Sequence, residues 1–256
     1  IEGNDDEIFV RALLSHFEDY SEIEFLNQFM ILDSGGRSSP DDIDNIRNII
    51  ANECNTDPKT LRILALMDKD YNSLLHRKTE ASRAKELDIF YFVWKMTEKE
   101  NYFIPWIFHD CYTKSENKEE SVAKADKVIE DLVKLSTDRA LNDIMRDFRS
   151  FKKKNKKKNQ LTLDIFEKEI EDLKMQLNLD HLLNLEDEKY PHIHKFLRKW
   201  ESKLHHIDAK LFIEKLEYDY DEEYLLSLFD PNFYDEFAEL KNLIDIMMNI
   251  YLNLQS

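Results

Sequence analysis

Glycine is scarce in this chain: three of its 256 residues are glycine, and five are proline. Tight hairpins, strand bulges and glycine-lined phosphate loops need glycine, because glycine alone reaches positive φ without steric cost. Sheet architectures and glycine-dependent nucleotide sites therefore lose support, and helices with short connections remain. Apolar residues recur at the helical period, for example at Phe166, Ile170, Leu173 and Leu177. We therefore predict an all-α fold.

Prolines and acidic residues mark the expected helix starts. Pro40 follows Ser39 and precedes Asp41, which is typical of an N-cap, a first-turn proline and an acid that suits the helix dipole. The pair Asp57-Pro58 repeats the signal. The predicted helices are 7–31, 41–53, 58–68, 71–97, 101–113, 119–154, 161–183, 188–206, 208–228 and 232–254.

The segment 33–40 is the clearest candidate for a joint between two parts of the chain. It holds two of the three glycines and ends in Ser-Ser-Pro. We therefore predict an N-terminal helical extension over residues 1–39 and a compact multi-helix domain over residues 40–256. The chain starts with Ile1 rather than methionine, which suggests that it derives from a longer polypeptide.

The charge balance restricts the expected partners. The formal net charge is −17, with 53 acidic and 36 basic residues. Such a surface disfavours nucleic acid and anionic membranes, so we expect protein partners. Cys54 and Cys111 form no metal-knuckle spacing, and the longest apolar stretch, 87–94, is too short to cross a bilayer. We expect an intracellular protein of the cytoplasm or nucleus.

The segment 104–112 carries the strongest chemical signal, the dipeptide His109-Asp110. An imidazole and a carboxylate at the end of a buried helix can hold a divalent metal ion. This segment resembles the HD superfamily of metal-dependent phosphohydrolases, in a branch whose helix ends in Trp-Phe-His-Asp-x-x-Tyr and continues into Asn-Glu-Glu-x-Ser-Ala. The matching residues are Trp106, Phe108, His109, Asp110, Tyr112, Asn117, Glu119, Glu120, Ser121 and Ala123.

The resemblance implies an HD-like helical bundle from about Asp70 to the end of the chain. The metal ligands it implies are Glu80, His109, Asp110 and Asp180. Glu80 replaces the histidine that the branch carries at this position, and Asn178 is an alternative to Asp180. His76 matches a histidine of the branch and would help to position phosphate. A further histidine near the substrate has no counterpart, so the departures predict a degenerate member.

Two functions follow from this resemblance. The first is a non-catalytic helical protein-interaction domain on an eroded HD-like fold, with no cofactor. The alternative is a metal-dependent phosphohydrolase that acts on a nucleotide or another small phosphate ester and needs a divalent ion. There His76, His109 and Asp110 would serve catalysis.

Each of these signals also has a structural interpretation. His109-Asp110 can be a simple helix terminus, and Glu80 an exposed helix residue. Four further histidines are expected to be solvated at the surface: His192, His194, His205 and His206. The basic run Lys152–Lys158 reads as an import signal, an anion-binding strip or a solvated loop. The strip 214–224, rich in acids and tyrosine, either receives a basic peptide or forms the outer face of a helix whose Leu225 packs inward.

Overall fold

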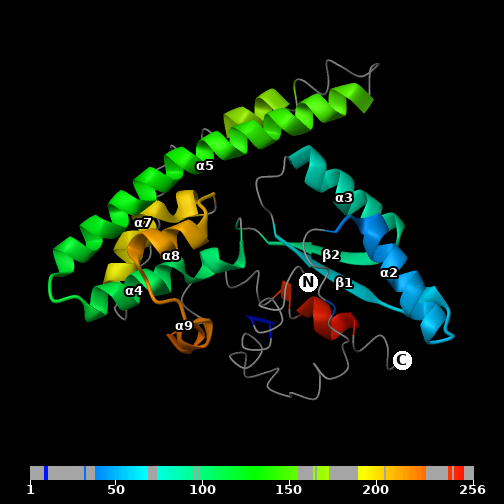
Figure 1. Ribbon diagram of the computed structural model, residues 1–256, viewed down its shortest axis with the longest axis horizontal. Helices are drawn as coiled ribbons and strands as arrows, with labels where there is room; N and C mark the ends of the chain where they lie inside the picture. The colour runs from blue at the N-terminus through cyan, green and yellow to red at the C-terminus, as the bar shows by residue number, and fades with distance from the viewer. Residues whose placement is uncertain are drawn as a thin grey trace. The chain divides into compact units, whose positions relative to one another are not determined.

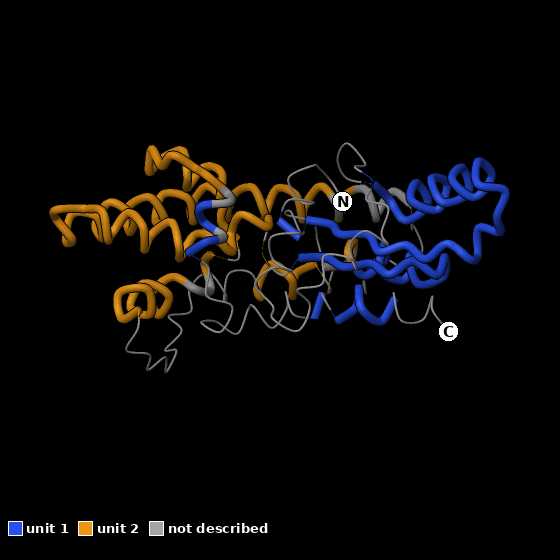
Figure 2. The backbone as a smooth tube through the Cα atoms, turned by 90° about the horizontal axis from the view of Figure 1, so that it is seen from below, with its two compact units in different colours: residues 1–68, 78–95, 222–256 blue, residues 69–77, 96–221 orange. Residues whose placement is uncertain are grey.

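The computed structural model describes part of the chain in two compact units. The described residues are 9–10, 32, 38–68, 74–94, 96, 98–154, 164, 166–172, 190–204, 206–228, 242–243 and 245–250. Unit 1 comprises residues 1–68, 78–95 and 222–256, and unit 2 comprises residues 69–77 and 96–221 (Figure 2).

Most of the described chain is helical, but two strands pair within it (Figure 1). In chain order the elements are α2 (Pro40–Glu53), the 3-10 helix η3 (Pro58–Thr60), β1 (Ile63–Met67), α3 (Leu74–Glu86), β2 (Ile89–Val93), the 3-10 helix η4 (Lys99–Phe103), α4 (Ile104–Lys114), α5 (Lys118–Lys154), α7 (Pro191–Leu204), α8 (Ala209–Leu216) and α9 (Glu222–Leu228).

The all-α prediction is wrong in one region, because β1 and β2 form a parallel sheet. Their register runs from Ile63 opposite Ile89 to Met67 opposite Val93. Helices were expected over 58–68 and 71–97. Short apolar runs do not separate a buried strand from a buried helix by periodicity, and a strand covered on both faces is a continuous apolar run.

The scarcity of glycine does not exclude a sheet of this kind. Parallel strands are joined by a crossover helix, here α3, and so need no hairpin turn. Among the described residues, three that are not glycine adopt positive φ: Asn55 at 51°, Asp88 at 55° and Glu217 at 56°. Asn and Asp tolerate this region better than most residues. Asp88 thus ends α3 and leads directly into β2.

The first face of the sheet packs against α2 and α3 within unit 1. Its core consists of Ile43, Ala65, Met67, Ala84 and Ile89, all buried. Among these residues, Ala65, Met67 and Ile89 belong to the sheet. Successive side chains of a strand point to opposite faces, so the residues between them point to the second face.

The second face of the sheet has its own cover. Phe92 and Phe9 each contact Trp94 edge to face, at centroid distances of 5.1 and 5.8 Å. All three of these side chains are buried. The second face is therefore buried at Phe92, whereas Phe90 on the same face is 40% exposed.

The capping signal at Ser39 is confirmed. The Ser39 hydroxyl accepts from the Asp42 amide, and the Asp42 carboxylate accepts from the Ser39 amide, as in a capping box. Asp57 also caps, but the helix after it lasts only three residues. Two arginines then attach α2 to α3: Arg83 pairs with Asp41 at 2.6 Å, and Arg47 donates to the Leu87 carbonyl at 2.8 Å.

Helix α4 is the centre of unit 2. It packs against α5, α7 and α8, and its residues Ile104–Phe108 are all buried. A helix that is apolar on all sides belongs in the interior of a domain. Phe108 stacks on Phe196 of α7 with a centroid distance of 4.2 Å, which fixes α4 against α7.

The side-chain amide of Asn101, in η4 directly before α4, connects this segment with the end of α7. Its nitrogen donates to the carbonyls of Leu204 and Ile207 at 2.8 and 2.9 Å, and its oxygen accepts from the Glu98 amide at 3.0 Å. Asn101 is fully buried. A buried amide with its groups paired fixes the chain, whereas an unpaired one would cost free energy.

Helix α5 has 37 residues and so extends for about 55 Å. Its first half contacts α4, α7 and α8, for example through Asp126, which accepts from the indole of Trp200 at 2.5 Å. The second half forms a separate small core with the helical residues 166–172, in which Ala140, Ile144 and Phe166 are buried. We call α5 residues 140–154 together with residues 166–172 the arm.

Of the other predicted helices, three are present, one is divided into two, and three lie mostly outside the described residues. The helices predicted at 101–113, 119–154 and 188–206 are present as α4, α5 and α7, with shifted ends. The one predicted at 208–228 is split at Glu217 into α8 and α9, and Leu225 packs inward as expected. Most of 7–31, 161–183 and 232–254 lies outside the described residues, and the 1–39 boundary stays a prediction. None of the described helices combines the length and the apolar character needed to span a bilayer.

We predict that Ile89→Ala destabilises the protein by about 2–5 kcal/mol, because it leaves a cavity between the sheet and α2 and α3. Phe90→Ala, one residue away in the same strand and 40% exposed, should cost less than about 1 kcal/mol. Urea unfolding followed by circular dichroism measures both. Equal losses in the two variants would contradict the assignment of the buried face.

Candidate functional site

His109 and Asp110 lie in the middle of α4, which continues to Lys114, so they do not mark its end. Consecutive helix residues point about 100° apart. The two side chains accordingly meet different elements of unit 2. His109 contacts α7, whereas Asp110 contacts the residue that follows the α8 cap.

His109 pairs with a histidine of α7. Its Nδ1 lies 2.7 Å from Nε2 of His192, so one ring donates a hydrogen bond to the other. The ring planes differ by 18°, with centroids 4.9 Å apart. This His109–His192 pair joins two segments that are 83 residues apart in the sequence.

Aromatic rings surround the His109–His192 pair. Tyr112 stacks on His192 at 4.4 Å, and the edges of Trp106 and Tyr190 meet His109 at 6.1 and 5.4 Å. These contacts restrict the rotation of both imidazoles. Such arrangements contribute beyond simple burial, typically by about 0.5–1.5 kcal/mol per aromatic pair.

Both imidazoles of the pair are harder to protonate than free histidine. Burial lowers the pKa of His109, and the neighbouring Asp110 carboxylate opposes this only in part. Burial lowers the pKa of His192 to about 4, with further contributions from His109, Lys118 and His194. The pair is therefore neutral at pH 7.

Asp110 is 3% exposed, and its carboxylate is bound within the protein. Its Oδ2 accepts from the Tyr218 hydroxyl at 2.9 Å and lies 2.8 Å from the Lys114 ammonium. Tyr218 is positioned by Glu217, whose left-handed conformation ends α8. Burying a carboxylate is costly unless it is paired, and these two partners offset the cost.

The other predicted ligands belong to other parts of the chain than His109. Glu80 lies on α3 in unit 1, and its Oε2 accepts from the Tyr91 hydroxyl at 3.1 Å. His76 is the third residue of α3. Asp180 and its alternative Asn178 lie outside the described residues. No group of three or more His, Cys, Asp or Glu side chains suited to a metal ion occurs among the described residues.

Part of the motif behind the HD resemblance has a structural role. The Asn117 side chain accepts from the Glu120 amide at 3.2 Å and donates to the Glu120 carboxylate at 3.3 Å. The first of these bonds is an N-cap at the start of α5, and the second joins the two side chains. Asn117 and Glu120 therefore need no metal site to explain their spacing.

The sheet supplies a second candidate site, which the sequence analysis missed. Parallel strands end at the same edge, and here the Trp94 amide donates to the Met67 carbonyl at 3.0 Å across that edge. Asp68 follows β1 directly, and its Oδ1 is buried. We call this the carboxyl edge of the sheet. If residues 63–67 had been predicted as a strand, Asp68 directly after it would have indicated this site.

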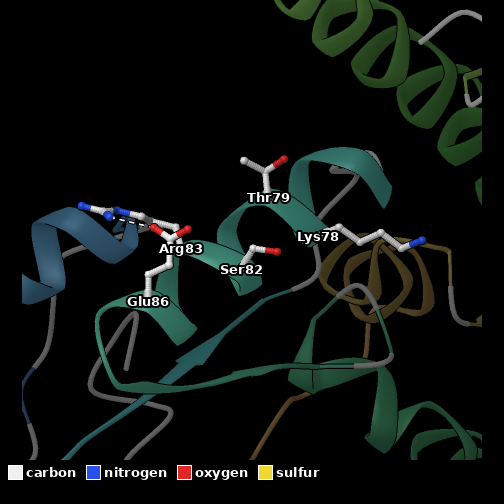
Figure 3. A pocket seen from close by; sticks show the side chains of 5 residues that line it. All are labelled: Lys78, Thr79, Ser82, Arg83 and Glu86. Atoms are coloured by element: carbon white, nitrogen blue, oxygen red, sulfur yellow. Dashed lines mark hydrogen bonds and ion pairs between the residues drawn. The ribbon is translucent and has the colours of Figure 1, made fainter. Parts of the chain in front are cut away.

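Helix α3 bears a shallow hollow of about 390 Å³ (Figure 3). Its lining side chains are Lys78, Thr79, Ser82, Arg83 and Glu86, all from this one helix. Arg83 is already paired with Asp41 and Glu86. A surface formed by a single helix encloses little of a ligand, so the hollow does not qualify as a binding pocket.

Two histidines of α7 are also placed differently from the prediction of solvated surface residues. His194 is 4% exposed, and His192 is half-buried in the pair. Ile193, Phe196 and Leu197 form the buried stripe of α7. His192 precedes Phe196 by one helical turn and so lies on the same face of α7. This spacing is the sequence signal that predicts burial of His192.

The His109–His192 pair makes stability depend on pH. Unfolded His192 binds a proton near pH 6.5 and folded His192 only near pH 4, so the unfolded state binds more protons in between. We therefore expect stability to fall as pH falls from 6.5 towards about 4. His192→Phe keeps the ring stack and should lose less stability over this range in urea unfolding. Parallel pH profiles of the two proteins would contradict this.

The chain matches no known protein family in the comparison with family models. No curated protein and no solved structure is significantly similar to it. The resemblance to the HD superfamily therefore stays a hypothesis that rests on the residues of 104–123.

Proposed function

We propose that this chain is a metal-dependent phosphohydrolase acting on a phosphate ester, with its metal ion held at the carboxyl edge of the β1–β2 sheet. The observation that supports this is the position of Asp68, directly after a buried parallel strand. The proposal keeps the enzyme class that the sequence suggested as an alternative and moves the metal site away from His109 and Asp110.

The chemistry of the edge fits this class. In open parallel sheets, ligands bind outside the carboxyl ends of the strands. Carboxylate oxygens suit Mg²⁺ and Mn²⁺, which bind through one or two carboxylates together with substrate phosphate. An ion held there would activate water and neutralise phosphate charge.

The contacts of Asp110 support moving the site. Its Oδ2 accepts a hydrogen bond from Tyr218 and is paired with the Lys114 ammonium. A metal ion bound to this oxygen would have to displace these partners. At Asp110 this would leave buried polar groups without partners, which is costly.

We predict that Asp68→Asn weakens Mn²⁺ binding by more than about tenfold, the loss that changing even an outer partner of a metal ligand typically causes. Asp131→Asn makes the same chemical change at an exposed position of α5 and should leave the affinity unchanged. Isothermal titration measures binding, and Mn²⁺-dependent hydrolysis of p-nitrophenyl phosphate esters should fall in parallel. Equal Mn²⁺ affinities in the wild type and both variants would overturn the proposal.

A second candidate function is a non-catalytic helical protein-interaction domain, and helix α5 together with the arm favours it. The arm continues from the half of α5 that packs against the other helices of unit 2, and its own core is small. On α5, Leu135 and Met145 are 39% and 38% exposed. Their ten-residue spacing leaves them about 80° apart around the helix, within the width of one amphipathic face that a partner helix could cover.

We expect the double variant Leu135→Glu and Met145→Glu to lose protein partners that co-purify with the wild-type chain. Lys134→Glu adds charge at a neighbouring exposed position and should retain them. Quantitative mass spectrometry of the purified complexes measures the difference. Identical partner sets in all three proteins would remove this face from consideration.

A further inference from the structure

We propose that His109 and His192 together form a binding site for Zn²⁺ on the surface of unit 2. This site is separate from the metal site of the proposed function, because its ligands are imidazoles rather than carboxylates. It is also different from the ligand set that the HD resemblance implies, since His192 has no part in that set.

The two ligand atoms already face each other. Nδ1 of His109 and Nε2 of His192 are 2.7 Å apart, closer than two nitrogens bound to one ion. Zn–N distances of 2.0–2.1 Å place two tetrahedral ligands about 3.3 Å apart. The rings must therefore separate by about 0.6 Å and tilt.

The hydrogen bond between the rings already requires that one of the facing nitrogens offers a lone pair. In the hydrogen bond, one of the two facing nitrogens carries a hydrogen. When the ion binds, this hydrogen moves to the far nitrogen of the same ring. Both facing nitrogens then offer a lone pair, and no net proton is released.

The surroundings hold the ligands in place and leave a path for the ion. Tyr112 covers one face of His192, and Tyr190 and Trp106 border His109. Both histidines remain partly exposed, so an ion can enter.

The nearby charges act in both directions. Asp110, next to His109 in the sequence, favours a cation, and Lys118, which acts on His192, opposes one. Lys118 is held by the Tyr112 and Thr113 carbonyls at 2.6 and 2.9 Å, and its ammonium lies over the Tyr112 ring.

The ligand type selects the class of ion. Imidazole nitrogen suits Zn²⁺, Cu²⁺ and Ni²⁺, whereas Mg²⁺ and Ca²⁺ require oxygen. Two protein ligands leave the other positions to water, so we expect weaker binding than in closed sites with four protein ligands. An ion bound here would join α4 to α7 and stabilise the folded state by mass action.

The test is Zn²⁺ titration of the full chain by calorimetry. The wild type should bind one more Zn²⁺ than His192→Phe, which keeps an aromatic ring on Tyr112 but lacks the nitrogen. His109→Phe should lose the same ion, and His206→Gln, which removes an imidazole elsewhere, should retain it. Equal Zn²⁺ stoichiometry and affinity in the wild type, His192→Phe and His109→Phe would overturn the proposal, as would a wild type that binds no Zn²⁺.

A second measurement locates the ion. Cu²⁺ quenches indole fluorescence at short range, and the Trp106 ring lies 6.1 Å from the His109 ring. Cu²⁺ should quench the wild type, and quenching should fall in Trp106→Phe and in His192→Phe. Asp68→Asn should behave as the wild type here, so failure of the proposed function leaves this result unchanged. Undiminished quenching in both ring variants would place the ion elsewhere.

Discussion

The parallel pairing of β1 with β2 is the constraint on which unit 1 depends. Parallel strands require a crossover, so α3 must lie between them in the sequence and pack on the sheet. A sheet of only two described strands has little stability of its own and relies on what covers it. Ala65 and Met67 meet α2 and α3 on one face, and Phe92 meets Trp94 on the other. The same pairing brings the ends of both strands to one edge, where Asp68 stands.

Local signals were reliable where local chemistry decides the structure. Ser39 and Pro40 predicted the start of α2 because a capping box involves only neighbouring residues. At Asp57 the cap was correct but the helix after it was not, because a cap does not determine how long a helix continues. The sheet was missed because pairing between residues 63–67 and 89–93 is a tertiary property, and scarce glycine excludes hairpins rather than crossovers.

The candidate site was harder to foresee than the helices. Sequence spacing identified His109 and Asp110 as unusual, but it could not show that they point to different elements. His192 became visible only when α7 packed on α4, because its partner lies 83 residues away. Tyr218 is a similar case: it reaches Asp110 only because Glu217 takes a left-handed conformation that few non-glycine residues adopt. Such contacts depend on packing and leave no periodic pattern.

The amide of Asn101 also has a consequence for the order in which the protein folds. Its hydrogen-bond acceptors, the carbonyls of Leu204 and Ile207, lie more than a hundred residues later in the chain. During synthesis, Asn101 therefore emerges long before its hydrogen-bond acceptors, and the loop to be closed is long. Contacts of such wide separation slow folding. Unit 2 should consequently acquire its final packing only after α7 has left the ribosome.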